Sequence, residues 1–281
     1  MPEGDSLRRA EALLAPILDG QTVTDVWFKK IRGHRPRPGQ RIEQVNAVGK
    51  HLLINFDRNL TLRIHLGMTG SFRVIPPDSA LPKSPRLRVV LQTKLGTALC
   101  FSAPTIDTFI RGAGASPVDH LGPDLSDDTV DVTEVVKRAR SLAPTADLAS
   151  ALLDQRIAAG VGNVFKSEVA FLAGVHPFTP ISSLSDGELV RLWRLAHQQL
   201  LANRDRNSRK TTTDRIGGQS YVYGRFRSAC RRCSSSIEFS PAGEITERST
   251  YWCPHCQPQS KRISASSKGP ADQPVTPSSG K

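Results

Sequence analysis

The chain has 281 residues and carries 38 Lys and Arg against 26 Asp and Glu, which gives a formal net charge of +12. The length allows two domains with separate cores, and the positive charge predicts a polyanionic partner, with nucleic acid as the first candidate. The chain has no apolar run long enough to span a membrane and no apolar signal core before Glu3 and Asp5. We therefore expect no membrane association and a cytoplasmic, nucleoid-associated location.

The first residues offer a possible nucleophile. Pro2 is small enough to let Met1 be removed, which would expose a secondary amine. A terminal amine titrates near ~8, against ~10.4 for a Lys side chain, so more of it is neutral at pH 7. Such an amine can capture a carbonyl carbon as an iminium, and Glu3 could transfer protons beside it. The alternative is an ordinary frayed terminus.

The first half of the chain is predicted to be a short helix followed by strands. Apolar residues recur at helical spacing over 7–18, and Asp5 or Ser6 could cap that helix. Beyond it, alternating apolar residues separated by turn signals predict strands within 22–28, 42–56, 60–75 and 87–101. This pattern is typical of a β-sandwich or barrel. The Gly- and Pro-containing connection 111–123 is the predicted domain boundary.

The second half has helical periodicity, over 131–143, 147–157, 164–173 and 185–203. The cationic run 203–213 is either a solvated linker or a loop that contacts phosphate. Residues 258–281 are rich in Ser, Pro, Lys and Gly and are expected to be disordered.

A glycine-rich turn precedes the third of these helices. In Gly160-Val161-Gly162-Asn163 the two glycines permit a tight turn, and Asn163 follows at the expected helix start. The turn could expose backbone amides to a phosphate, or Asn163 could simply be the helix N-cap. The residues alone leave both interpretations open.

Four of the five cysteines form two CxxC pairs. Cys230, Cys233, Cys253 and Cys256 have the spacing of a four-cysteine zinc ribbon, with a strand, a turn and a strand between the pairs. With all four positions of a tetrahedral ion filled by protein, one zinc ion would be structural. Arg248 in this unit is either a phosphate contact or a solvated turn residue. Cys100 lies in an apolar run and is expected to be a buried core thiol.

Several motifs together resemble the bacterial formamidopyrimidine-DNA glycosylase and endonuclease VIII family of base-excision repair enzymes. The resemblance covers residues 1 to about 257. The motifs that carry it are Met1-Pro2-Glu3-Gly4, Gly49-Lys50-His51-Leu52-Leu53 on a predicted strand, His65-Leu66-Gly67-Met68-Thr69-Gly70, Gly160-Val161-Gly162-Asn163 in a helix-two-turn-helix, and Arg248 to Gln257 in the ribbon. The Pro-Glu-Gly start and the stretch 24–28 are similar to endonuclease VIII, while His65 to Met68 are similar to the other branch. The Arg-Arg-Phe-Gly wedge loop of the formamidopyrimidine branch has no counterpart around 104–111.

The resemblance implies a role for each site residue. Pro2 would form the Schiff base and Glu3 would donate protons. Lys50 and Arg248 would contact phosphate and protonate the leaving groups of β- and δ-elimination respectively. Asn163 would bind the same stretch of DNA backbone, Met68 would fill the space left by an extruded base, and Lys166 would bind DNA. Many family members carry a second acid where this chain has Ser6, so the role of that position is open.

The sequence therefore predicts a multidomain α and β protein: a catalytic β-sandwich domain with an N-terminal helix (1–115), a helical helix-two-turn-helix domain that binds DNA (116–222), a zinc ribbon (223–257) and a disordered tail (258–281). The predicted function is a DNA glycosylase and abasic-site lyase, active as a monomer on double-stranded DNA with oxidised bases or abasic sites, with pyrimidines favoured. The alternatives are a formamidopyrimidine/8-oxoguanine-type purine glycosylase and a non-catalytic zinc-ribbon DNA-binding protein.

Overall fold

The computed structural model describes residues 2–206, 208–213, 218–243 and 248–259. Nearly all of the tail predicted to be disordered lies outside these residues. The helices are α1 (Gly4–Leu18), α2 (Val132–Leu142), α3 (Leu148–Leu153), α4 (Asn163–Ala173) and α5 (Asp186–Arg204), with a short 3₁₀ turn η1 (Ile181–Ser183). The strands are β1 (Asp25–Phe28), β2 (Ile42–Val48), β3 (His51–Phe56), β4 (Leu60–His65), β5 (Ser71–Ile75), β6 (Leu87–Thr93), β7 (Gly96–Phe101), β8 (Thr105–Ile110), β9 (Glu238–Ser240) and β10 (Thr250–Trp252).

Strands β1 to β8 form the predicted β-sandwich. One antiparallel sheet has the order β1-β6-β7-β5 and the other the order β2-β3-β4-β8. Their inner faces enclose one apolar core, to which α1 contributes Leu7, Leu14 and Leu18. Cys100 belongs to this core and is 1 % exposed, which confirms the predicted buried thiol; burial raises its pKa to about 12.

Three predicted β regions contain two strands each: 42–56 and 87–101 form hairpins, whereas the two strands within 60–75, β4 and β5, belong to different sheets. The runs 42–56, 60–75 and 87–101 each divide at a turn into two strands, because a glycine-containing turn interrupts each apolar pattern. Strand β8 was not predicted. It pairs with β4 along its whole length, and only three residues separate it from β7, so no wedge loop stands there.

Helix α1 begins earlier than predicted and without the predicted cap. Its N-cap is Glu3, and no side chain caps the first turn. Asp5 and Ser6 lie inside the helix, so the prediction that either residue caps it is wrong. The Asp5 carboxylate pairs instead with Arg9 one turn further along the helix and with Arg209 from a distant segment.

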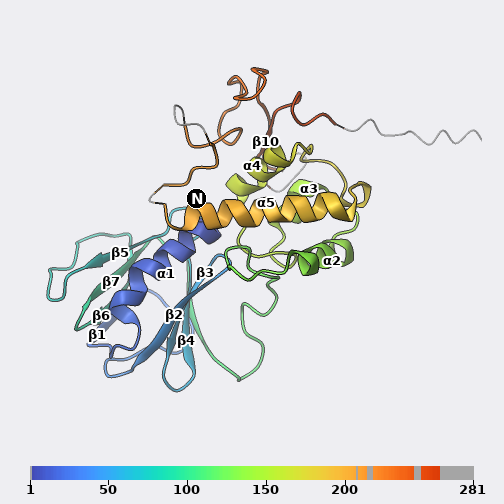
Figure 1. Ribbon diagram of the computed structural model, residues 1–281. Helices are drawn as coiled ribbons and strands as arrows, with labels where there is room; N and C mark the ends of the chain where they lie inside the picture. The colour runs from blue at the N-terminus through green and yellow to red at the C-terminus, as the bar shows by residue number, and fades with distance from the viewer. Residues whose placement is uncertain (1, 207, 214–217, 244–247, 260–281) are drawn as a thin grey trace, which may run out of the picture.

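The helices α2 to α5 form a second unit around a separate apolar core centred on Phe165 and Trp193. Helix α3 stops four residues short of its predicted end, since Asp154 takes an extended conformation. A third, small cluster joins Phe171 of α4 to Tyr221, Val222 and the cysteines. Figure 1 shows the N-terminus at the junction of the sandwich and α5, with the cysteine unit beyond α4. The exact domain limits at 115 and 222 stay predictions.

Membrane insertion was not expected, and among the helices of the described residues none combines the length and the apolar character that a bilayer crossing requires.

Candidate active site

The N-terminal turn is docked onto the glycine-rich turn before α4. The backbone N–H of Gly4 donates to the carbonyl of Gly160 at 2.9 Å. A Cβ at Gly4 would lie 3.0 Å from the Cα of Gly160, so the two backbones approach as closely as two glycines permit. Residues 156 positions apart in the chain therefore form one local structure.

Glu3 occupies the N-terminus of α4. Its carboxylate accepts hydrogen bonds from the backbone N–H groups of Gly162 (2.7 Å), Val164 (2.8 Å) and Phe165 (3.3 Å). The side chain is fully buried. A helix N-terminus favours a negative group, and here that group is a carboxylate of the protein. The amides of Gly162, Val164 and Phe165 therefore face a carboxylate of the protein rather than a phosphate.

Asn163 is turned toward the cysteine unit. The N-cap of α4 is Gly162, so the interpretation of Asn163 as a helix cap is wrong. Its Nδ2 donates to the Ser249 hydroxyl at 3.2 Å. Its Oδ1 is buried and has no hydrogen-bond partner among the described residues. A polar atom in this state is suited to a ligand or a water molecule.

Lys50 lies in the turn between β2 and β3, not on a strand as predicted. Gly49 has a φ of +56°, and its N–H donates to the Asp124 carboxylate at 2.8 Å. A Cβ at Gly49 would lie 2.9 Å from the Cβ of Ala159, so the turn needs glycine to pack against the helical unit. Burial lowers the pKa of Lys50 to about 8, while the charge of Glu3 raises it and the charges of Arg248 and Arg209 lower it further. Lys50 is thus within electrostatic reach of all three.

The register of β3 and β4 places the loop with Met68 next to the Lys50 turn. His51 is paired with His65 across the two strands, and their ring centroids are 5.0 Å apart. The loop that follows His65 carries Met68 at its tip, where the side chain is 65 % exposed. An exposed apolar side chain beside a cationic turn has the placement expected of a wedge, which stays a prediction.

Arg248 and Lys166 differ in burial, although both lie near the contact between α4 and β10. Arg248 is exposed. Lys166 is fully buried, and its ammonium donates to the Ser249 carbonyl at 2.9 Å and the Thr250 hydroxyl at 2.8 Å. Burial lowers the pKa of Lys166 to about 7. The structure thus gives Lys166 a bond to the cysteine unit, while its predicted contact with DNA stays a prediction.

The four cysteines converge on one point. Their sulfur atoms all lie within 4.8 Å of one another, with Sγ–Sγ distances of 3.9 Å for Cys230 and Cys256 and 3.5 Å for Cys233 and Cys253. Tetrahedral coordination with metal–sulfur bonds of about 2.3 Å places neighbouring sulfurs roughly 3.8 Å apart. The cluster therefore fits one tetrahedral metal ion.

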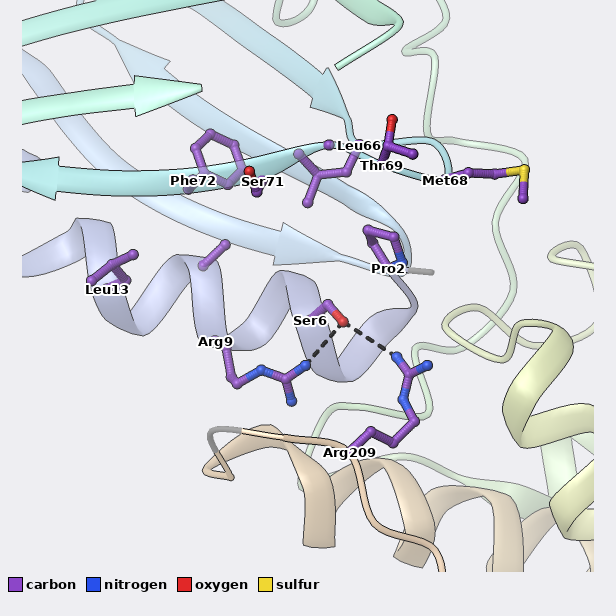
Figure 2. A pocket seen from close by; sticks show the side chains of 12 residues that line it. Pro2, Ser6, Arg9, Leu13, Leu66, Met68, Thr69, Ser71, Phe72 and Arg209 are labelled. Atoms are coloured by element: carbon purple, nitrogen blue, oxygen red, sulfur yellow. Dashed lines mark hydrogen bonds between the residues drawn. The ribbon is translucent and has the colours of Figure 1, made fainter. Parts of the chain in front are cut away.

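A pocket of about 470 Å³ opens beside Pro2. Figure 2 shows Pro2 facing the loop of Leu66 and Met68, with Arg209 across the first turn of α1. The pocket is lined by residues from α1, from the loop and strand after β4, and from the segment after α5: Pro2, Ser6, Arg9, Ala10, Leu13, Leu66, Met68, Thr69, Gly70, Ser71, Phe72 and Arg209. Pro2 therefore borders a cavity that is shared by three segments distant in the sequence.

Two residues of this site were not predicted from the sequence. Asp124 anchors the Lys50 turn, and Arg209 pairs with Asp5 and Glu3. The run 203–213 was predicted to be a linker or a phosphate loop. For Arg209 neither interpretation is correct, because its side chain is only 14 % exposed and is turned toward the protein's own carboxylates. The cationic run was the only signal in the sequence.

Known proteins resemble the chain over most of its length. Residues 1–105 match the family model for the formamidopyrimidine-DNA glycosylase N-terminal domain, and residues 121–213 match the H2TH domain model of the same enzymes. The chain is 40 % identical to a probable endonuclease 8 2 of Streptomyces coelicolor, covering 92 % of this chain and 94 % of that protein. It is 37 % identical to the DNA-(apurinic or apyrimidinic site) lyase Nei2 of Mycolicibacterium smegmatis, covering 92 % and 99 %.

Solved structures show the same fold. The MutM (Fpg) protein of Thermus thermophilus superposes with a TM-score of 0.75 at 28 % identity, covering 91 % of this chain and 98 % of that one. The formamidopyrimidine-DNA glycosylase of Lactococcus lactis, crystallised with DNA containing an abasic site, gives 0.76 at 20 % identity, covering 92 % and 100 %. The predicted architecture of sandwich, helix-two-turn-helix unit and cysteine ribbon is confirmed.

Proposed function

The chain belongs to the formamidopyrimidine-DNA glycosylase and endonuclease VIII family, and on that premise we propose that it excises oxidised bases from double-stranded DNA and cleaves the resulting abasic site. The substrate would be bound by a monomer in the nucleoid. The net charge of +12 supports a polyanionic partner.

The nucleophile in this proposal is the amine of Pro2, exposed once Met1 is removed. The amine attacks C1′ of an extruded nucleotide, the bond from C1′ to the base breaks, and the base leaves with a proton. The sugar ring opens and an iminium links Pro2 to C1′. Loss of a C2′ proton expels the 3′ phosphate, and a second elimination expels the 5′ phosphate. Glu3 serves as the proton donor for ring opening.

One observation carries the proposal: Pro2 borders the pocket while the next residue, Glu3, is buried on the N-terminus of α4. This arrangement holds a carboxylate beside the terminal amine. A frayed terminus would have neither the burial nor these bonds. The inert-terminus alternative, in which the chain only binds DNA, therefore loses its structural support.

Three residues from separate parts of the chain would bind the phosphates around the lesion. Lys50 and Arg248 act on each other electrostatically, and Asn163 would donate to a phosphate oxygen through its Nδ2, which here bonds the Ser249 hydroxyl. With a pKa of about 8, Lys50 is better suited than an ordinary lysine to give a proton to the phosphate that leaves in β-elimination. Arg248 would assist the δ-elimination. Met68 would fill the space of the extruded base.

Zinc is the metal we propose for the cysteine cluster, because four thiolates in tetrahedral arrangement are its preferred structural site. With every position of the ion taken by cysteine, it would hold β9 and β10 in place and leave the chemistry to Pro2. Cys253 is fully buried beneath this hairpin.

Oxidised pyrimidines are the proposed lesions. The names of the relatives, endonuclease 8 and Nei2, support this preference, as does the short connection between β7 and β8. The alternative is 8-oxoguanine-type purines, processed by the same chemistry. Cleavage rates of matched duplexes with thymine glycol or 8-oxoguanine decide between them: faster cleavage of the 8-oxoguanine duplex would contradict the pyrimidine assignment.

Borohydride trapping tests the catalytic proposal. The protein, incubated with an abasic-site duplex and borohydride, should form a covalent adduct whose peptide map places the sugar on Pro2. A chain that keeps one extra, uncleaved residue before Pro2 is the matched control, because its Pro2 nitrogen is an amide; a Pro2→Gly variant should also trap more slowly. No adduct from the native chain, or equal trapping by the extended chain, would contradict the proposal.

A further inference from the structure

An arginine from the segment after α5 binds the turn that carries Pro2. Arg209 donates through Nε to one oxygen of the Asp5 carboxylate at 2.9 Å and through Nη2 to the other at 2.5 Å. Its Nη1 also lies 3.5 Å from the Glu3 carboxylate. A two-point bond between a guanidinium and a carboxylate fixes orientation as well as distance.

The ion pairs of Arg209 are important because the carboxylates that it contacts are buried. Glu3 and Asp5 are both fully buried, and two carboxylates without a cation would be costly to remove from water. Burial opposes the positive charge of Arg209, but the charges of Glu3 and Asp5 outweigh it and raise the pKa of the guanidinium. The guanidinium also lies over the Phe165 ring, 4.8 Å from its centroid. Arg209 thus links α1 to the first turn of α4.

Arg209 itself is attached to a fixed segment. The backbone N–H of the next residue, Lys210, donates to the Asn203 side chain at 2.6 Å. The Thr211 hydroxyl donates to the buried Glu168 carboxylate on α4. The segment is therefore anchored on both α5 and α4, and the guanidinium can act as a fixed point for the N-terminal turn.

The same arginine also contacts Ser6, the position at which many family members carry a second acid. The Ser6 hydroxyl accepts hydrogen bonds from Arg9 at 3.0 Å and Arg209 at 3.3 Å, as Figure 2 shows. The buried acid of this turn is Asp5, one residue earlier. Ser6 lines the pocket beside Pro2, whereas Asp5 is buried and absent from the lining, so the pocket has a neutral group at this turn.

We propose that Arg209 is the positioning residue of the nucleophile: through Asp5 it sets where the Pro2 amine stands relative to C1′ of the bound nucleotide. The inference rests on the proposed function of Pro2 and adds a residue to it. Arg209 acts through Asp5 and Glu3. A displaced amine lowers the rate of covalent capture while leaving phosphate binding by Lys50, Asn163 and Arg248 intact.

Single-turnover trapping and equilibrium binding measure separately the rate of covalent capture and the affinity for DNA. At saturating abasic-site duplex, Arg209→Gln should form the borohydride adduct about 10- to 100-fold more slowly, with its Kd for an uncleavable abasic analogue within about twofold of the native value. Arg209→Lys keeps the charge without the two-point bond and should remain slow. Arg204→Gln is the matched control: it removes the same charge nearby, from an exposed pair with Asp128, and should trap at the native rate.

A double-mutant cycle keeps the test valid if Arg209→Gln folds poorly. Asp5→Asn removes the buried charge that Arg209 binds at two points, so in Asp5→Asn/Arg209→Gln position 5 carries no unpaired charge, while Glu3 keeps its backbone N–H donors on α4. Thermal melting should show that the double variant is folded. Its rate of adduct formation should be no lower than that of either single variant, because both changes break the same interaction. Additive losses, or native trapping rates in folded Arg209 variants, would overturn the inference. Absence of any adduct from the native chain would instead contradict the proposed function, and this role with it.

Discussion

The carboxylate of Glu3 accepts a 2.7 Å hydrogen bond from the backbone N–H of Gly162, which lies 159 positions further along the chain. The proposed catalytic acid is thereby the N-terminal anchor of α4, and α4 also carries Asn163 and Lys166. One carboxylate thus joins the chemistry of the N-terminus to the unit expected to bind DNA.

Gly162→Ala should slow the reaction strongly by disturbing this contact. A Cβ at position 162 would lie 2.5 Å from Cγ and Cδ of Glu3, although the backbone φ of −122° suits alanine. Glu3 must move, so we expect trapping about 100-fold slower and a loss of roughly 1–3 kcal/mol of stability. Gly187→Ala is the control, since nothing lies within 4 Å of its Cβ; its activity should be native. Native activity of Gly162→Ala would contradict the role of Glu3.

The pKa of Lys50, lowered by burial to about 8, predicts proton-coupled binding of DNA. A phosphate favours the ammonium form, so affinity should fall as the pH rises through about 8 and Lys50 loses its proton. Fluorescence anisotropy with an uncleavable abasic duplex at pH 7 and pH 9 measures this change. Lys50→Arg stays charged over the range and should remove most of the pH dependence. An equally steep dependence in Lys50→Arg would assign the titration to another group.

Met68→Ala should affect extrusion without affecting the fold. The side chain is 65 % exposed, so stability should stay within about 0.5 kcal/mol. Excision of a damaged base from a duplex requires extrusion and should slow markedly, whereas trapping on a single-stranded abasic oligonucleotide should not. Leu81, 46 % exposed on the same sandwich and absent from the pocket lining, provides the control Leu81→Ala. Equal slowing on both substrates would argue against a wedge.

Lys166 should make the stability of the protein depend on pH. Its pKa is lowered from 10.5 to about 7, chiefly by burial, with the charges of Asp147 and Glu3 opposing the change. The unfolded chain therefore binds more protons between pH 7 and 10.5, and the cost of burying the ammonium is relieved as the pH rises through that window. Relative to Lys166→Met, the native chain should gain up to about 1 kcal/mol per pH unit above pH 7. Thermal melting of both chains at pH 6.5 and 8.5 measures the difference; a constant difference would contradict it.

Removal of the metal should weaken DNA binding. Chelation, or Cys253→Ser at a fully buried ligand position, should release the hairpin that carries Arg248 and reduce affinity for the abasic duplex. Elemental analysis of the native protein should find about one zinc per chain. Cys100→Ser changes a cysteine outside the cluster and should leave the zinc content unchanged. An unchanged affinity for the abasic duplex after complete loss of zinc would argue against a role of the ribbon in DNA binding.

Much of this protein could be read from its residues. Spacing alone indicated the metal cluster, since four cysteines in two CxxC pairs have few other uses. Alternating apolar residues indicated the sandwich, and helical periodicity located α2, α4 and α5 to within a residue or two. These features depend on interactions between residues close together in the chain, so the spacing of residue types in the sequence is enough to predict them.

The site depended on contacts between distant segments. Whether the turn before α4 exposed its amides to a phosphate or Asn163 capped the helix could not be decided without knowing that Glu3 reaches this helix from the N-terminus and accepts hydrogen bonds from its amides. Likewise, the importance of Arg209 among several arginines was invisible, because only the fold brings it onto Asp5. Sequence determined which chemical groups the protein has and the elements that carry them. The tertiary structure decided which charges are buried together, since the cost of an unpaired buried charge depends on partners that can lie anywhere in the chain.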